Sequence, residues 1–183
     1  MLAGLNMAFL GASSAGSVRS ALESPRLPAQ VPEDTLQGFR AETTALRDQL
    51  PSQPRRSGNV AVAGIDVPGL PERMAGHSQI RKPEGEFVGN PVGDPFRTRT
   101  VPNAEGTPID RRTDSEYKTL DTIANRLGGN RAATGSIVLF TERPTCDSCS
   151  RVVSQFRWQY PGIQVTIVDN QGRTLRPPPR ANP

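Results

Sequence analysis

The clearest pattern of apolar and polar positions lies in the C-terminal half of the chain. Apolar residues recur at helical spacing over 114–127, and the two glycines at 128–129 predict the end of that helix. Residues 137–140 form an unbroken apolar run, which is typical of a strand covered on both faces. A second helical period follows over 146–160. This succession of helix, buried strand and helix predicts an α/β unit.

Further strands are expected on either side of this unit. Residues 60–66 and 163–169 are the best candidates, because each combines small and β-branched apolar residues. Residues 173–176 follow a turn and read as a short returning strand, which would close a C-terminal β-hairpin. Another short strand is expected over 74–80, and the alternation at 96–101 suggests one more within a Gly-, Pro- and Arg-rich stretch that is otherwise expected to be loop. The order predicts a mixed sheet of about five strands.

The N-terminal part has a different character. Residues 1–57 are largely rich in Ala, Gly, Ser and Pro, which indicates a linker or the end of another region. One amphipathic helix is expected over 33–50, docked on a neighbouring domain, and 51–58 reads as linker. We therefore expect one packed domain over 58–177 and a disordered tail over 178–183.

Composition and charge narrow the function only slightly. Of the 183 residues, 34% are hydrophobic, which is low for a chain packed throughout, and no apolar run is long enough to span a bilayer. No membrane partner is therefore expected. The net charge is +4, and all basic residues except Lys82 and Lys118 are Arg, whose planar fork suits phosphate. Charge alone still favours a solvated basic surface over a nucleic-acid site.

A C-x-x-C motif joins the buried strand to the second helix. Cys146 and Cys149 are the only two cysteines, and a place on the first helical turn favours thiolate over thiol. Two thiolates one turn apart can hold one Zn²⁺, which keeps a position for water in a catalytic site. Asp114, at the start of the preceding helix, is the candidate third ligand, and Glu116 beside it is the candidate proton carrier.

Each part of this site has a plainer alternative. The stretch Thr113–Glu116 is also a capping box, T-x-x-E, with no chemistry. A strand-to-helix C-x-x-C is equally the layout of a thiol–disulfide oxidoreductase with Cys146 as nucleophile. A third alternative is a non-catalytic nucleic-acid binding module stapled by zinc. The only histidine, His77, is expected to be a surface or strand residue rather than a zinc ligand.

Three stretches of the sequence carry a specific likeness. They are D-S-E-Y-K-T-L-D-T-I-A at 114–124, G-S-I-V-L-F-T-E-R-P-T-C-D-S-C-S-R-V-V-S-Q-F at 135–156 and Y-P-G-I-Q-V at 160–165. They resemble a family of bacterial polymorphic-toxin deaminases that act on nucleic acid. The resemblance covers roughly residues 110–169, with a weaker match back to about residue 74.

The resemblance implies both a fold and an activity. The fold is the three-layer, cytidine deaminase-like α/β fold. The activity is hydrolytic deamination of cytosine to uracil in nucleic acid, with single-stranded DNA favoured. Asp114, Cys146 and Cys149 would hold one Zn²⁺, and Glu116 would move the protons. Members are toxin domains neutralised by a cognate immunity protein, so the resemblance also implies delivery into the cytoplasm of a target bacterium, with residues 1–57 ending the delivery region.

Two positions depart from the pattern of the family. Asp114 stands where the superfamily ligand is usually His, and a carboxylate is an accepted zinc ligand. Thr145 stands where Pro usually precedes the first Cys, while Pro144 comes one residue earlier. We expect Thr145 to act as the N-cap of the second helix.

The candidates for contact with nucleic acid are mostly arginines. A phosphate role is expected for Arg143, Arg97, Arg99, Arg111 and Arg112. Within the C-x-x-C segment, Thr145 and Ser148 are further candidates. Trp158 and Tyr160 could stack on bases, although packing in the core is the favoured role for Trp158.

Overall fold

One six-stranded mixed sheet forms the centre of the protein, in the order β3-β2-β1-β6-β7-β8. The computed structural model describes residues 30–93, 95–102 and 106–175. The helices are α1 (Glu33–Asp48), α2 (Ser52–Arg56), α3 (Ser115–Leu127) and α4 (Asp147–Gln159), and a 3₁₀ turn covers Arg111–Thr113. The strands are β1 (Val60–Asp66), β2 (Arg73–His77), β3 (Phe87–Val88), β4 (Val101–Pro102), β5 (Pro108–Ile109), β6 (Gly135–Thr141), β7 (Ile163–Asp169) and β8 (Thr174–Leu175).

The strand pairing confirms the fold class expected from the sequence. β1 pairs antiparallel with β2 and β6, β6 pairs parallel with β7, and β7 pairs antiparallel with β8. The α/β class, the mixed sheet and the C-terminal hairpin are therefore present. The sheet has six strands rather than about five, because β3 joins its edge parallel to β2. This strand lies in the Gly-, Pro- and Arg-rich stretch that was expected to be loop.

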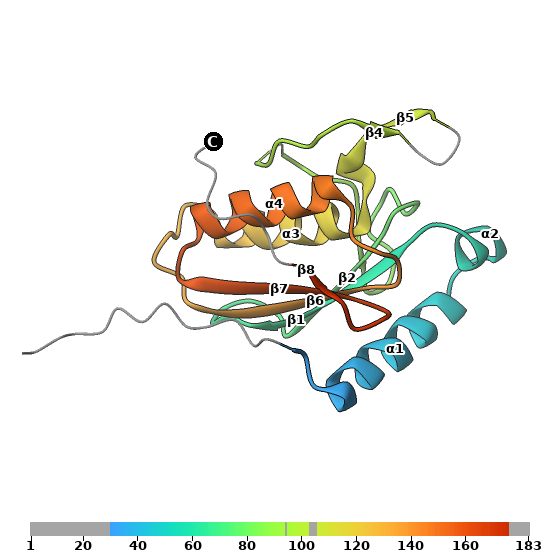
Figure 1. Ribbon diagram of the computed structural model, residues 1–183, viewed down its shortest axis with the longest axis horizontal. Coiled ribbons are helices and arrows are strands. Elements are labelled where there is room, and N and C mark those ends of the chain that lie inside the picture. Colours follow the sequence, from blue (N-terminus) through green and yellow to red (C-terminus); the bar gives the residue numbers. More distant parts are fainter. Residues whose placement is uncertain (1–29, 94, 103–105, 176–183) are drawn as a thin grey trace, which may run out of the picture.

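Helices cover both faces of the sheet, which gives three layers (Figure 1). α3 and α4 lie on one face and α1 lies on the other. The period of two along β1 explains how one strand serves both layers. Ala63 and Ile65 belong to the apolar cluster beneath α3 and α4, whereas Val60 and Val62 belong to the cluster beneath α1.

α1 is the docked helix expected in the N-terminal part. Its Phe39 stacks on Phe140 of β6, with the ring centroids 5.8 Å apart. Near its C-terminal end, the Arg47 guanidinium donates hydrogen bonds to the backbone carbonyls of Pro54 and Arg55. These bonds organise the short helix α2, where the sequence predicted only linker. The limits of the toxin domain and of the delivery region stay predictions.

Residues 96–101 do not form the strand that their alternation suggested. Only the last of them joins a strand, β4, which pairs with β5 in a separate two-stranded sheet. Phe96 is instead buried against Tyr117 and Phe156, with ring centroids 6.1 and 6.0 Å away. The apolar residue of this stretch therefore anchors a loop on α3 and α4 rather than pairing in the sheet.

Other expectations concern the ends of elements and of the chain. β2 ends at His77 rather than at Ile80, because the Ile80 N–H turns back to the His77 carbonyl. Residues 1–29, the larger part of the linker expected over 1–32, and the tail expected over 178–183 lie outside the described residues. Within the described ranges, every helix is too short or too polar to cross a membrane.

Candidate metal centre and proton-transfer site

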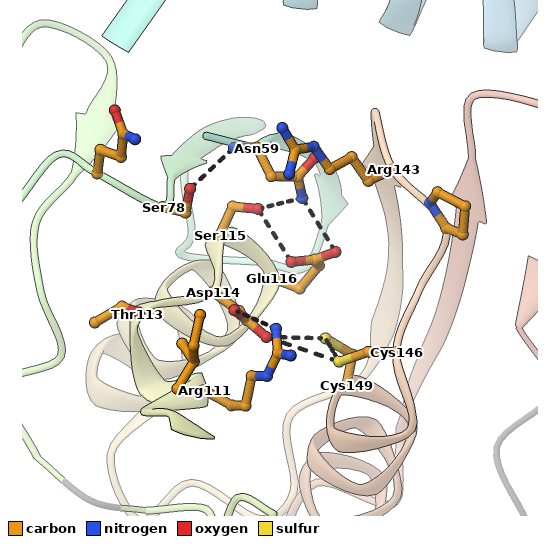
Figure 2. A pocket seen from close by; sticks show the side chains of 13 residues that line it. Asn59, Ser78, Arg111, Thr113, Asp114, Ser115, Glu116, Arg143, Cys146 and Cys149 are labelled. Carbon is orange, nitrogen blue, oxygen red and sulfur yellow. Dashed lines mark hydrogen bonds and ion pairs between the residues drawn. The ribbon is translucent and has the colours of Figure 1, made fainter. Parts of the chain in front are cut away.

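Two helix N-termini meet at one end of the sheet. Asp114 is the N-cap residue of α3 and Cys146 is the N-cap residue of α4, and neither side chain makes a capping hydrogen bond. Both side chains instead turn toward each other, and Cys149 joins them from the first turn of α4. Figure 2 shows the Asp114 carboxylate facing the two sulfurs. Asp114 Oδ2 lies 3.7 Å from Cys146 Sγ and 3.9 Å from Cys149 Sγ, and the sulfurs are 3.3 Å apart.

These three distances, 3.3–3.9 Å, are close to those between the ligands of a tetrahedral zinc ion. With zinc–sulfur bonds of about 2.3 Å and zinc–oxygen bonds of about 2.0–2.2 Å, tetrahedral ligands stand roughly 3.5–3.8 Å apart. Two sulfurs and one carboxylate oxygen are also a donor set that zinc accepts. Three protein ligands leave a fourth position open, as in catalytic rather than structural sites. Among the residues that the structure describes, no other group of His, Cys, Asp and Glu side chains has a metal-like arrangement.

The electrostatics of the three side chains also suit a cation. Burial, followed by the negative charges of Glu116 and Cys146, raises the pKa of Asp114 to about 7, although Arg111 lies 3.6 Å away and opposes this. The hydrogen bond with Cys149 lowers the pKa of the Cys146 thiol to about 6. The same contact, followed by burial, raises the pKa of Cys149. A metal ion between these groups would favour the charged form of each.

Glu116 lies beside this cluster without belonging to it. Its carboxylate is buried, and both of its oxygens accept hydrogen bonds. The Ser115 hydroxyl donates to Oε2 over 3.0 Å, and the Thr141 hydroxyl donates to Oε1 over 2.8 Å. Asn59 Nδ2 approaches Oε1 at 3.3 Å. The carboxylate is thus held in one orientation next to three candidate metal ligands.

A cavity of about 320 Å³ opens onto both the thiol pair and Glu116. Pockets for small organic groups measure roughly 300–1,000 Å³, so this cavity suits a single base better than a larger ligand. Its wall is formed by the residue before β1, the turn after β2, β5, the 3₁₀ turn, the start of α3 and the C-x-x-C segment. The lining residues are Asn59, Ser78, Gln79, Ile109, Arg111, Thr113, Asp114, Ser115, Glu116, Arg143, Pro144, Cys146 and Cys149.

The structure brings some of the candidate nucleic-acid contacts to this cavity. Arg143 is exposed and lies on its wall, and Arg111 lies on the wall as the ion-pair partner of Asp114. Arg112 does not line the cavity and pairs with the exposed carboxylate of Asp110. Arg97 is exposed but also lies outside the lining set.

Other candidates are placed elsewhere. Ser148 is buried, and its hydroxyl accepts a hydrogen bond from the Arg99 backbone N–H. Thr145 does not line the cavity. The expectation that Thr145 caps α4 is wrong, because Cys146 occupies the N-cap position. The capping-box alternative for α3 is wrong in the same way: Asp114 is the N-cap, and the Thr113 hydroxyl donates to the Asp110 carbonyl instead.

The two aromatic candidates at the end of α4 are far from the cavity. Twelve helical positions separate Trp158 from Cys146, which is roughly 18 Å at 1.5 Å per residue. The expected core packing of Trp158 is wrong, since its exposure is 41% and Arg131 lies over its ring at 4.9 Å. Tyr160 is buried, and its hydroxyl donates to the backbone carbonyls of Ala124 and Gly128. Its ring is therefore not available for base stacking.

His77 is a strand residue, as expected, and it is fully buried at the end of β2. Its Nε2 lies 3.0 Å from the Pro54 carbonyl, and its Nδ1 accepts a hydrogen bond from the Gln79 N–H. Both ring nitrogens are thus engaged away from the thiol pair. Burial is the main cause that lowers the pKa of His77. The neutral imidazole ties α2 to the turn after β2.

The sequence analysis missed five residues of this site. Asn59, Ser115 and Thr141 contact Glu116 or one another, and Ser78 and Gln79 line the cavity. A faint signal existed for Asn59 and Thr141, since each is a polar residue at one end of an apolar strand. Their contact joins positions 82 residues apart, so no local pattern could reveal it.

Comparison with known proteins gives one family. The model of the toxin-deaminase family, described as the BURPS668_1122 family of deaminases, matches residues 43–171. The match includes the C-terminal part of α1, the whole six-stranded sheet except β8, and every residue of the site. None of the curated proteins compared with the chain matches it.

Proposed function

The chain belongs to the BURPS668_1122 family of toxin deaminases, and from this premise we propose that it converts cytosine to uracil in single-stranded nucleic acid, DNA in preference to RNA. A deaminase of this family is a hydrolytic enzyme and a toxin. The proposal adds the base, the polymer and a zinc cofactor. One observation carries it: a buried, oriented carboxylate, Glu116, shares a base-sized cavity with a zinc-like set of two sulfurs and one oxygen.

In the proposed reaction, metal binding and proton transfer are carried out by different side chains. Asp114, Cys146 and Cys149 would hold Zn²⁺, which when bound makes water a good nucleophile near neutral pH. Glu116 would take one proton from the attacking water and hand it to ring nitrogen N3, and then take the second from the new C4 hydroxyl and hand it to the departing amino group. A C4–O bond forms, the C4–N bond breaks, and ammonia leaves. The cavity walls exclude bulk water from the base during these transfers.

The shape of the site supports a single-stranded substrate. A base stacked in a duplex cannot reach a cavity between β1, α3 and the C-x-x-C loop, and flipping it out costs least when it is unpaired. Arg143 lies on the cavity wall, and its guanidinium would contact a neighbouring phosphate. The net charge of +4 favours a polyanion in the same way.

As a toxin, the domain would act after delivery into the cytoplasm of a target bacterium. Residues 1–57 would then be the end of the delivery region. A cognate immunity protein would protect the producing cell. These partners follow from the class of protein, and we propose them together with the activity.

Oligonucleotides containing each base in single-stranded and duplex form, incubated with the zinc-loaded protein and read by sequencing, test the proposal. Wild-type protein is expected to produce uracil at cytosine in single strands. Glu116→Gln should abolish conversion while zinc content and melting temperature stay near wild type. Equal rates for Glu116→Gln and wild type would rule out this mechanism, and conversion of adenine would correct the base.

One observation favours a second candidate, a thiol–disulfide oxidoreductase. The Cys146 and Cys149 sulfurs are in contact, and the Cys146 pKa is lowered to about 6, which suits a nucleophilic thiolate. An oxidoreductase mechanism, however, gives no role to Glu116 or to the hydrogen bonds that orient it. Insulin reduction separates the two, because a deaminase should show none. A zinc-stapled binding module would bind nucleic acid and change no base.

A further inference from the structure

The Glu116 carboxylate is enclosed by polar side chains from three separate segments of the chain. Ser115 comes from α3 itself, Thr141 from the end of β6, and Asn59 from the residue just before β1. Asn59 Nδ2 lies 2.8 Å from Ser115 Oγ and 2.8 Å from Thr141 Oγ1. Figure 2 shows Asn59 joined to both Ser115 and Glu116. We call Asn59, Ser115 and Thr141 the glutamate cage.

Hydrogen counting fixes the direction of every bond in the glutamate cage. The Asn59 amide nitrogen carries two hydrogens, and its two shortest contacts are the oxygens of Ser115 and Thr141. Each hydroxyl then has an acceptor lone pair occupied and a single hydrogen left to place. That hydrogen points at Glu116 in both cases, to Oε2 from Ser115 and to Oε1 from Thr141. Asn59 therefore sets both hydroxyl rotors.

The observed orientation of the Asn59 amide leaves the amide oxygen without a hydrogen bond in the part of the chain that the structure describes. Its Oδ1 is buried and finds no hydrogen-bond partner within the described residues. Turning the amide over would place this carbonyl oxygen beside Glu116 Oε1, which Nδ2 now approaches at 3.3 Å. An unpaired buried acceptor costs stability, so the arrangement serves the carboxylate at the expense of the fold. The Asn59 backbone is also clamped, since its N–H donates to Ser78 Oγ and its carbonyl accepts from the Ser78 N–H.

We propose that Asn59 is a positioning residue of the reaction, which acts by making Ser115 and Thr141 hold Glu116 in the one orientation that faces both the thiol pair and the cavity. This inference rests on the proposed function. Misplacing a catalytic group by up to about 1 Å lowers the reaction rate on the order of tenfold to a hundredfold. Substrate affinity should change little, because the cage contacts the carboxylate rather than the remote parts of the substrate.

The test measures kcat and KM for uracil formation by zinc-loaded variants. Asn59→Ala and Thr141→Val should each lower kcat at least about tenfold, with KM within about twofold of wild type. Thr141→Ser, which keeps the hydroxyl, should restore most of kcat. Because both residues act through Glu116, Asn59→Ala combined with Thr141→Val should cost less than the product of the single losses. The matched control is Thr43→Val, since Thr43 is buried on α1 and its hydroxyl finds no partner among the described residues.

Carboxyl ¹³C NMR of glutamate-labelled protein gives a readout that needs no turnover, with Glu116→Gln assigning the resonance. Asn59→Ala should move or broaden the Glu116 signal, and Thr43→Val should leave it in place. If wild type deaminates and Asn59→Ala has the same kcat, the positioning role is overturned while the function stands. If no oligonucleotide is converted, the proposed function fails, and an unmoved Glu116 resonance would overturn the cage as well.

Discussion

The Asp114 carboxylate lies 3.7 Å from the Cys146 sulfur although 32 residues separate them along the chain. Both are N-cap residues whose side chains leave the capping hydrogen bond unmade. The positive ends of two helix dipoles therefore point at a group of side chains that carry negative charge when ionised. This relationship gathers the three candidate metal ligands at one point of the fold.

Removing the Asp114 carboxylate should release the metal. Wild-type protein is expected to hold about one zinc per chain, with three protein ligands. Asp114→Ala should weaken zinc binding by more than about a hundredfold, since loss of an outer partner alone can cost 10–100-fold. Metal analysis after dialysis against a weak chelator measures this. Asp110→Ala is the matched control, because Asp110 is an exposed neighbour paired with Arg112. Full zinc retention by Asp114→Ala would move the third ligand elsewhere.

A side chain at Gly76 should displace the helix that carries the site. A Cβ there would collide with the Ser115 carbonyl oxygen and would lie 2.6 Å from the Thr119 hydroxyl. Gly76→Ala should therefore cost about 1–3 kcal/mol of unfolding free energy, as overpacking does, and lower kcat. Urea denaturation and the uracil assay measure the two effects.

Gly38→Ala provides the comparison for this substitution. Gly38 is an exposed position inside α1 with open space around its Cβ direction. Alanine there should stabilise the protein by about 0.5–1 kcal/mol without a change in activity. A Gly76→Ala protein as stable and active as Gly38→Ala would show that α3 does not need its close approach to β2.

Stability should depend on pH through the buried amine of Lys118. Its Nζ donates to the carbonyls of His77, Ser78 and Ile80. Burial, followed by the charge of Arg81, lowers the pKa of Lys118 from 10.5 to about 8. Between these two pH values the unfolded chain binds the proton and the folded chain does not, so this contribution to stability rises with pH.

Lys118→Met isolates that contribution. The unfolding free energy of wild type minus that of Lys118→Met should increase from pH 8 toward pH 10.5, and be nearly flat below pH 8. Urea denaturation at several pH values measures the difference, in which the titration of groups that do not interact with Lys118 cancels. Parallel curves for the two proteins would show that Lys118 keeps its ordinary pKa in the fold.

Loss of Arg143 should weaken binding to single-stranded DNA equally for all sequences. One lost phosphate contact should lower the slope of log affinity against log salt by about 0.7. Fluorescence anisotropy of labelled oligonucleotides at several salt concentrations measures both affinity and slope for Arg143→Gln. Arg157→Gln is the charge-matched control, because Arg157 lies near the far end of α4, outside the cavity wall. Identical behaviour of the two variants would place the phosphate contact elsewhere.

The main helices and strands and the reactive groups could be predicted from the sequence. The periods of apolar residues in helices and strands depend only on neighbours along the chain. The segments α3, β6, α4 and β7 could therefore be predicted from the apolar pattern alone. The same holds for the thiol pair and for Asp114 with Glu116, because each pair lies within one turn of a helix start. Expectations failed where a long-range contact overrode a local pattern. Phe96 is the example, because its ring packs against α3 and α4 and so holds a loop that precedes both helices.

Which of these groups meet depends on the three-dimensional packing of the whole chain. The placement of β1 between β2 and β6 brings Asn59 within reach of Thr141, 82 residues away, and so completes the hydrogen bonds around Glu116. The same packing leaves Trp158 at the far end of α4 and buries Ser148 away from the cavity. Sheet order is fixed by how apolar faces from the whole chain cover one another, and that information is absent from any single stretch of residues.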